Sequence, residues 1–81
     1  MTIHKAIVTR IKQLMKENNV NQSTLSKITG IPKSTINDLL NYRTKTTSSL
    51  YIVKISKAFD IKLSKFFDND IFDNLEPLKN K

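Results

Sequence analysis

The chain has 81 residues, a formal net charge of +7, no cysteine, one histidine and one glycine. This length predicts a single small domain, and the lack of cysteine excludes a disulfide framework and a thiolate metal site. No run approaches the roughly 18 to 20 apolar residues of a membrane span, and no signal-peptide core follows Met1, so we expect a cytoplasmic protein.

Charge is distributed unevenly along the chain. Residues 1–67 carry twelve Lys and Arg residues against three acids, whereas residues 68–81 carry four acids against two lysines. A basic globular part favours a nucleic-acid partner, because neutralising phosphates releases condensed counterions. On composition alone, the alternative is equally good that the lysine residues serve only to keep the protein in solution.

The first part of the chain predicts a helix over residues 3–18. Apolar side chains recur there at helical spacing, at Ile7, Ile11, Leu14 and Met15. Basic side chains occupy the other side of this helix, and Thr2 is a suitable N-cap. His4, close to the end of the chain, is expected to have no role.

Residues 21–40 predict two short helices joined by a tight turn. Asn21 is a good N-cap for a helix over about residues 22–29, and Gly30 stands where the end of that helix needs a positive φ. Pro32 has no amide hydrogen and a φ near the helical value, so it marks the start of a second helix over residues 33–40. The apolar residues that give both helices a face to bury are Val20, Leu25, Ile28, Ile31, Ile36, Leu39 and Leu40. This chemistry is that of a helix-turn-helix.

The remaining pattern predicts two more helices. Residues 41–47 have no apolar period and predict an exposed loop. Ser48 or Ser49 then caps a helix that continues to about Phe59. A last short helix follows, with Leu63, Phe66 and Phe67 expected to close the core. About five short helices and no strand pattern predict a compact all-α bundle.

The order of these parts resembles the Cro/lambda-repressor-like helix-turn-helix family, also called the XRE family. The likeness covers about residues 3–67, and it rests on the following run: Gln22-x-x-Leu25-Ser26-x-x-x-Gly30-Ile31-x-x-Ser34-Thr35-Ile36-Asn37, then Asn41, a basic loop, Ile55-Ser56-Lys57-Ala58-Phe59 and Leu63-Ser64-Lys65-Phe66-Phe67. Tyr42 stands where this family usually has a glycine, so either Asn41 or Tyr42 must supply any left-handed residue there.

The resemblance implies that the helix over residues 33–40 lies in the DNA major groove, within a lambda-repressor-like DNA-binding domain over residues 1–67. By position, the residues that would read base edges are Lys33, Ser34, Thr35, Asn37 and Asp38. Asn37 can bond adenine through both amide atoms and Lys33 can donate to guanine, whereas Asp38 can only accept, for instance from cytosine N4. These side chains could instead be the solvated face of a short helix.

The resemblance also places residues beside the DNA backbone. Gln22 and Asn41 match positions that usually hold phosphates, although Gln22 could simply cap its own helix. Arg43 and Lys45, in the basic loop, could contact phosphates or the minor groove, or could be a flexible charged loop. Arg10 is a further candidate backbone contact, with a solvated helix face as its alternative.

Some apolar residues exceed what a single core needs. They are Leu50, Tyr51 and Val53 in the fourth helix, and Ile71, Phe72 and Leu75 in the acidic-apolar tail over residues 68–81. These residues are either satellite core or the contact of a homodimer, which we expect because one short reading helix touches few base pairs. The tail could instead order on contact with a protein partner.

These observations predict a sequence-specific regulator of transcription that binds double-stranded DNA, most simply a small repressor. The alternative is a protein-interaction module, like an antitoxin or a regulator's partner, that uses the tail. RNA or nonspecific nucleoid binding is a third possibility, disfavoured because no aromatic residue stands among the reading positions. We expect no enzyme activity, cofactor or metal ion, because the sequence lacks a glycine-rich phosphate loop and paired acids on an inward helix face.

Overall fold

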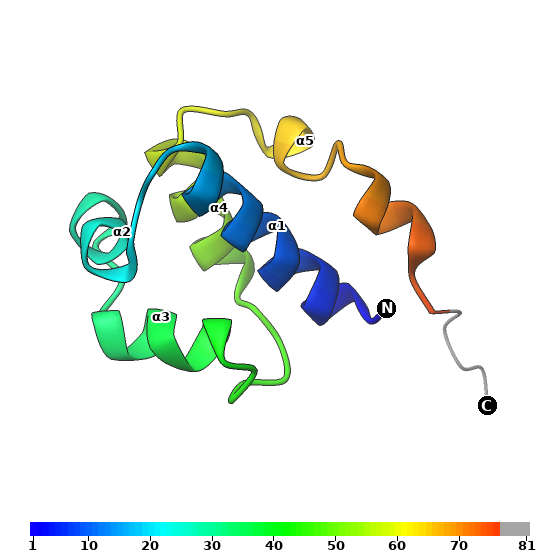
Figure 1. Cartoon of the computed structure of the whole chain (residues 1–81), viewed down its shortest axis with the longest axis horizontal. Helices are drawn as coiled ribbons and strands as arrows, with labels where there is room; N and C mark the ends of the chain where they lie inside the picture. The colour runs from blue at the N-terminus through cyan, green and yellow to red at the C-terminus, as the bar shows by residue number, and fades with distance from the viewer. Residues whose placement is uncertain (77–81) are drawn as a thin grey trace.

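The computed structural model describes residues 1–76, and no strand is present among them (Figure 1). Its elements in chain order are α1 (Ile3–Glu17), α2 (Gln22–Thr29), α3 (Lys33–Leu40), α4 (Ser49–Ala58), α5 (Leu63–Phe66) and the 3₁₀ helix η1 (Asp70–Asn74). The predicted all-α bundle is confirmed, and α2 and α3 have the expected bounds. The sequence did not predict η1, and residues 77–81 of the expected tail lie outside the described residues.

Polar side chains cap three of the α-helices at their N-termini, and Asn69 caps η1 in the same way. The Thr2 hydroxyl accepts from the Lys5 amide at 3.1 Å, and Asn21 Oδ1 accepts from the Thr24 amide at 2.8 Å. Ser48, one of two candidates, caps α4 by accepting from the Leu50 amide. Each cap satisfies an amide that has no partner within its own helix, which fixes where the helix begins.

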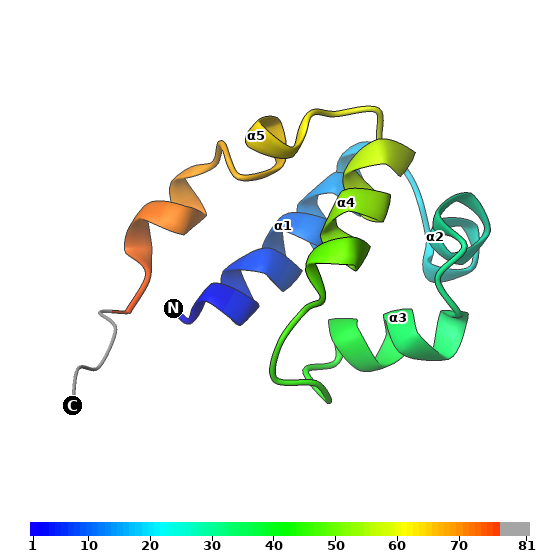
Figure 2. The ribbon, with the colours of Figure 1, turned by 180° about the vertical axis from the view of Figure 1, so that it is seen from behind.

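The core lies between α1, α4 and the corner formed by α2 and α3 (Figures 1 and 2). Its buried side chains are Ile7, Val8, Ile11, Leu14, Leu25, Ile31, Ile36, Leu39, Leu40, Ile52, Ile55 and Phe66. Helix α2 packs against both α3 and α4, so the helix-turn-helix is part of this core. The outer face of α3 is therefore presented by a rigid support.

Three residues expected in the core are exposed instead. Ile28 is 47% exposed, Leu63 is 46% exposed and Phe67 is 37% exposed. Helix α5 has only four residues, so it can turn just one large side chain, Phe66, fully inward. In α2, only Leu25 is buried; Ile28, three residues further along the same face, is left half exposed at the edge of the core.

The segment that follows α5 contacts α1 through η1. Figure 2 shows these elements from behind. Asn69 Nδ2 donates to Gln13 Oε1 at 3.0 Å, and Phe72 packs near Phe66 and Phe67 with ring centroids 6.4 and 5.1 Å away. The Glu76 amide donates to the Met1 carbonyl at 2.8 Å. No helix within residues 1–76 has both the length and the apolar character to cross a bilayer.

Candidate nucleic-acid interface

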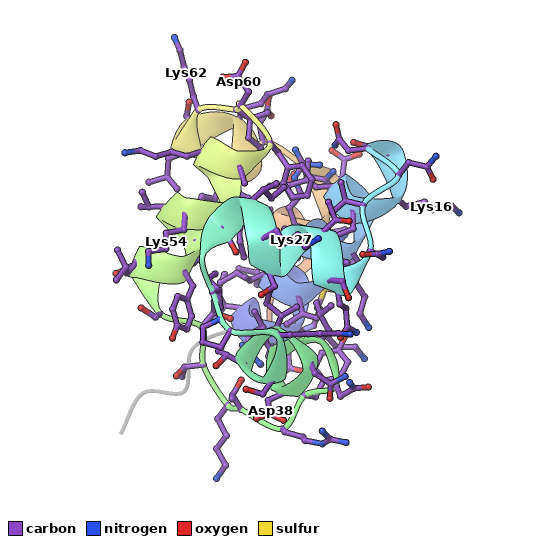
Figure 3. The ribbon with its side chains drawn as sticks, turned by 90° about the vertical axis from the view of Figure 1, so that its left-hand side faces the viewer. Lys16, Lys27, Asp38, Lys54, Asp60 and Lys62 are labelled. Carbon is purple, nitrogen blue, oxygen red and sulfur yellow. The ribbon has the colours of Figure 1, made fainter. Side chains whose placement is uncertain are left out.

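Helix α3 has one buried face and one outer face. Ile36, Leu39 and Leu40 are buried, and their directions around the helix place Ser34 and Asp38 at the centre of the opposite side. Figure 3 shows Asp38 on the side of α3 that faces away from α2. All five of the predicted base-reading residues, Lys33, Ser34, Thr35, Asn37 and Asp38, are exposed or partly exposed.

Asn37 lies on the flank of this outer face that is turned toward α2. Its Nδ2 donates to Gln22 Oε1 at 3.2 Å, so the first residue of α2 is linked to the middle of α3. One of the two amide hydrogens of Asn37 is used in this bond, and the other is left to meet a base or a solvent molecule. The bond holds two of the predicted DNA-contacting side chains in a fixed relation.

Arg43 reaches back from the loop onto the same face. Its Nη1 donates to Asn37 Oδ1 at 2.9 Å and to Asp38 Oδ1 at 3.2 Å. The Arg43 side chain nevertheless remains 64% exposed and that of Asp38 47% exposed. Gln22, Asn37, Arg43 and Asp38 therefore form a connected polar row along one surface, and Asn41 adjoins it by donating from Nδ2 to the Asn37 carbonyl at 2.8 Å.

The backbone turn after α3 brings Arg43 into this position. Tyr42 adopts a left-handed φ of 59°, and Asn41 does not, which answers the question that the sequence left open. The Tyr42 and Arg43 amides donate to the Leu39 and Asp38 carbonyls at 3.2 and 2.9 Å. This pair of bonds is a Schellman motif, which turns the chain back across the end of the helix.

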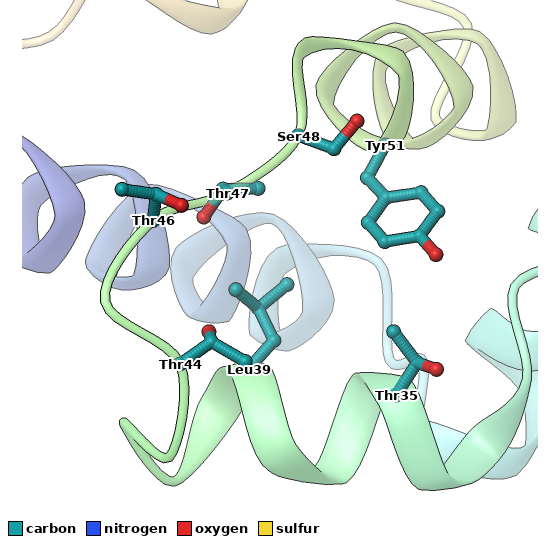
Figure 4. A pocket seen from close by; sticks show the side chains of 7 residues that line it. All are labelled: Thr35, Leu39, Thr44, Thr46, Thr47, Ser48 and Tyr51. Atoms are coloured by element: carbon teal, nitrogen blue, oxygen red, sulfur yellow. The ribbon is translucent and has the colours of Figure 1, made fainter.

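The loop beyond Arg43 stands away from α3. A cavity of about 320 Å³ lies between α3, this loop and the start of α4 (Figure 4), lined by Thr35, Leu39, Thr44, Thr46, Thr47, Ser48 and Tyr51. Lys45 is exposed and makes no ion pair with any residue of the described chain. The loop is thus attached at its two ends and open in between.

Sequence reasoning missed the residues that attach this loop to α1. His4, expected to have no role, has its Nδ1 3.1 Å from the Thr47 hydroxyl oxygen and its ring 6.4 Å from that of Tyr42. Lys12 Nζ lies 5.0 Å from the centre of the Tyr42 ring, within range of a cation–π contact. These pairs are more than 25 residues apart in sequence, so no local pattern could have indicated them.

Arg10 requires a correction. Its side chain is buried, with Nε donating to the Phe66 carbonyl at 2.7 Å and Nη2 to the Lys65 carbonyl at 3.1 Å. A guanidinium committed to these carbonyls inside the fold is not presented to a phosphate. We therefore leave Arg10 out of the interface and assign it to the contact between α1 and α5.

The structure distributes the surplus apolar residues between core and surface. Tyr51 and Phe72 are partly buried and pack against the core. Val53 and Ile71 are partly buried, whereas Leu50 is 57% exposed and Leu75 36% exposed. The exposed pair lies on α4 and just beyond η1, two separate places on the molecule.

Comparison with known proteins bears on this surface directly. The model of the Cro/C1-type HTH DNA-binding domain family matches residues 10–68, from within α1 to the end of α5 and well over half of the chain. No match to the chain is found among curated proteins or among solved structures. The chain therefore belongs to the Cro/C1-type helix-turn-helix DNA-binding domains.

Proposed function

We propose that the protein is a sequence-specific regulator of transcription, a small repressor, that reads the major groove of double-stranded DNA with α3. The observation that carries this proposal is the polar row on the outer face of α3, in which Gln22 and Arg43 hold the Asn37 amide from both sides. A side chain fixed before binding loses less conformational entropy when it meets a base edge. The major groove is wide enough to admit such a helix.

The surroundings of α3 suit the DNA backbone. Gln22 begins α2, whose first turn contains no acidic residue, so the positive end of the helix dipole is free to face a phosphate. Lys45 and Arg43 add positive charge in the adjoining loop, and Asn41 lies at the end of α3. Of these residues, Gln22, Asn41 and Lys45 are the proposed backbone contacts.

We infer that the regulator acts as a homodimer. A single module buries roughly 600 to 1,000 Å² on DNA, and a two-fold pair reads two half-sites with twice the contacts. Leu50 is the most exposed of the large apolar side chains in the described chain, at 57%. With Val53, one turn further along α4, it is our choice for the seam between two copies.

A protein-interaction role for the tail has less support. Its described part is bound to α1 through Asn69, to Phe66 of α5 through Phe72 and to the N-terminus through Glu76, so it is part of the fold. A partner would have to displace these contacts or use Leu75 and the acids around it. We therefore keep DNA reading as the main function.

The proposal is tested by comparing Asn37→Ala with Lys45→Ala. Sites are first selected from random duplex DNA with the unaltered chain, and affinities are then measured for the selected site and for a scrambled duplex. Asn37→Ala should lower affinity for the selected site by about tenfold or more, because a bidentate base contact contributes roughly 1 to 3 kcal/mol of discrimination. Its effect on scrambled DNA should be small.

Lys45→Ala is the matched control for charge alone. It should weaken both duplexes alike and reduce the slope of log affinity against log salt by about one unit, because one phosphate contact is lost. Equal losses on both duplexes from Asn37→Ala would contradict base reading by α3.

A further inference from the structure

Resting on the proposed function, we propose that Arg43 reads a guanine in the major groove and that Asp38 positions Arg43 without reading a base itself. The proposal changes the roles of both residues. Position in the family assigned Asp38 to the base edges, and the place of Arg43 in the basic loop indicated a contact with phosphates or the minor groove. The contacts that the two side chains make in the structure point to the reverse.

The first support is where the Arg43 side chain lies. It starts in the loop, yet its guanidinium rests against Asn37 Oδ1 at 2.9 Å and Asp38 Oδ1 at 3.2 Å, both on the outer face of α3. The Schellman motif at Tyr42 also fixes the Arg43 amide to the Asp38 carbonyl at 2.9 Å. Backbone and side chain together hold Arg43 against the helix that would enter the groove.

The second support is the number of donors that remain. A guanidinium has five N–H groups, and the contacts with Asn37 and Asp38 use only Nη1, which carries two of them. The three N–H groups on Nε and Nη2 are uncommitted among the described residues. Two of them suffice for the bidentate contact with guanine O6 and N7.

The third support is the charge of Asp38. A lone carboxylate beside phosphates would be repelled, but Asp38 is paired with Arg43 and so brings no net charge to the groove. Its Oδ1 accepts from Arg43, so the carboxylate already orients the guanidinium, and Oδ2 is the oxygen left to meet a base. Asp38 is thus better placed to steer a cation than to read a base.

The fourth support is the exposure of Arg43. Its side chain is 64% exposed, so it is held in place by its polar partners more than by packing. The loop beyond Arg43 does not cover it either, because a cavity of about 320 Å³ separates the loop from α3, and Figure 4 shows Thr44 and Thr46 on the far side of this cavity from Thr35. Removing the Asp38 carboxylate should release the Arg43 side chain while leaving the fold intact.

The test uses the full chain and the site selected from random duplex DNA. Affinity is measured for the selected site and for duplexes changed at each base pair in turn, with the unaltered chain, Arg43→Ala, Asp38→Ala and the double variant. We expect one G·C pair in each half-site whose preference falls about tenfold in either single variant, with no further loss in the double variant. If Asp38→Ala still lowers this preference in the Arg43→Ala background, Asp38 reads the base and the proposal is overturned.

A modified base separates the two readings of the same G·C pair. Replacing that guanine with 7-deazaguanine removes the N7 acceptor but leaves cytosine N4 unchanged. The unaltered chain should lose about tenfold in affinity, and Arg43→Ala should show no loss. An unchanged affinity of the unaltered chain would overturn the proposal.

Two controls address charge. Asp68→Ala removes an exposed acid of another ion pair, far from the outer face of α3, and should leave every base preference unchanged. Lys45→Ala should lower all affinities together. Far-UV circular dichroism and thermal unfolding of each variant check that the fold is retained.

The outcomes distinguish this proposal from the proposed function. A chain that selects no site from random DNA would refute sequence-specific reading altogether. A chain that selects a site dependent on Asn37, with preferences indifferent to Arg43, would overturn only the assignment made here.

Discussion

Among residues 1–76, three residues other than glycine adopt a left-handed backbone, and each follows the end of a helix. They are Asn19 after α1, Tyr42 after α3 and Asp60 after α4, with φ values between 55° and 59°. At all three, the two amides that follow the helix donate back to its last carbonyls, which completes a Schellman motif. Asn and Asp tolerate this region better than Tyr does, so the strain is greatest beside the proposed interface.

Replacing Asp60 with glycine should stabilise the protein. Glycine has no Cβ to resist a φ of 55°, so the free energy of unfolding should rise by about 0.5 to 1 kcal/mol even after the greater entropy of the unfolded chain is included. Urea unfolding followed by circular dichroism measures this change.

The control for Asp60→Gly is Asp60→Asn. It removes the same charge at the C-terminal end of α4, where an acid is unfavourable, while keeping a Cβ. The gain from glycine should exceed the gain from asparagine. A destabilised glycine variant would mean that the Asp60 side chain makes a contribution that outweighs the backbone strain.

At the scale of elements, the contact between α1 and α5 depends on Arg10. Its guanidinium joins the two elements by bonds to the Phe66 and Lys65 carbonyls, and Gln13 Oε1 accepts both from Arg10 at 3.4 Å and from Asn69 at 3.0 Å. Helix α5 is only four residues long and has no side-chain cap. Its last carbonyls have no partners within the helix, and the Arg10 guanidinium supplies donors for two of them.

Arg10→Met should therefore destabilise the protein. Methionine keeps the apolar length of the side chain but removes two hydrogen bonds from a charged donor. It leaves the Phe66 carbonyl without a donor and the Lys65 carbonyl with only the Asp68 amide, which should lower the free energy of unfolding by about 2 to 3 kcal/mol. Lys5→Met, an equal change at an exposed position of α1, should alter it by less than about 0.5 kcal/mol. Similar losses in both variants would show that the α1–α5 bonds contribute little.

Local chemistry was sufficient to predict most element boundaries. Asn21, Gly30 and Pro32 act on their immediate neighbours, and α2 and α3 begin and end where these residues indicated. The burial of Arg10 could not be predicted, because its partners lie more than 50 residues away and a charged side chain on a helix is ordinarily solvated. The polar row was predicted only as separate residues, because the bonds that link them depend on how α2, α3 and the loop meet.

At the scale of the whole molecule, the proposed dimer must place two copies of α3 on one duplex. The described chain extends 41 × 25 × 20 Å, and one copy presents a single α3, the proposed reading helix. Half-sites of a two-fold regulator are about 34 Å apart, one turn of the double helix. A seam close to α3 would set this spacing directly, which favours the start of α4 over the region beyond η1.

Leu50→Glu should therefore weaken the dimer. A carboxylate at the centre of an apolar seam loses its solvation on both copies at once, so the dimer dissociation constant should rise by at least about tenfold. Sedimentation equilibrium across a range of concentrations, without DNA, measures this constant. The unaltered chain should form dimers at micromolar concentrations.

The control for Leu50→Glu is Ile28→Glu, because Ile28 is a large apolar residue on α2 with a similar exposure, 47% against 57%. It should leave the dissociation constant unchanged, since α2 is not part of the seam. Leu75→Glu tests the region beyond η1 in the same way, and a larger effect there would move the seam to that region. If the unaltered chain stays monomeric up to high micromolar concentrations, two copies can meet only on DNA, and the spacing of the selected half-sites would then be set by the duplex alone.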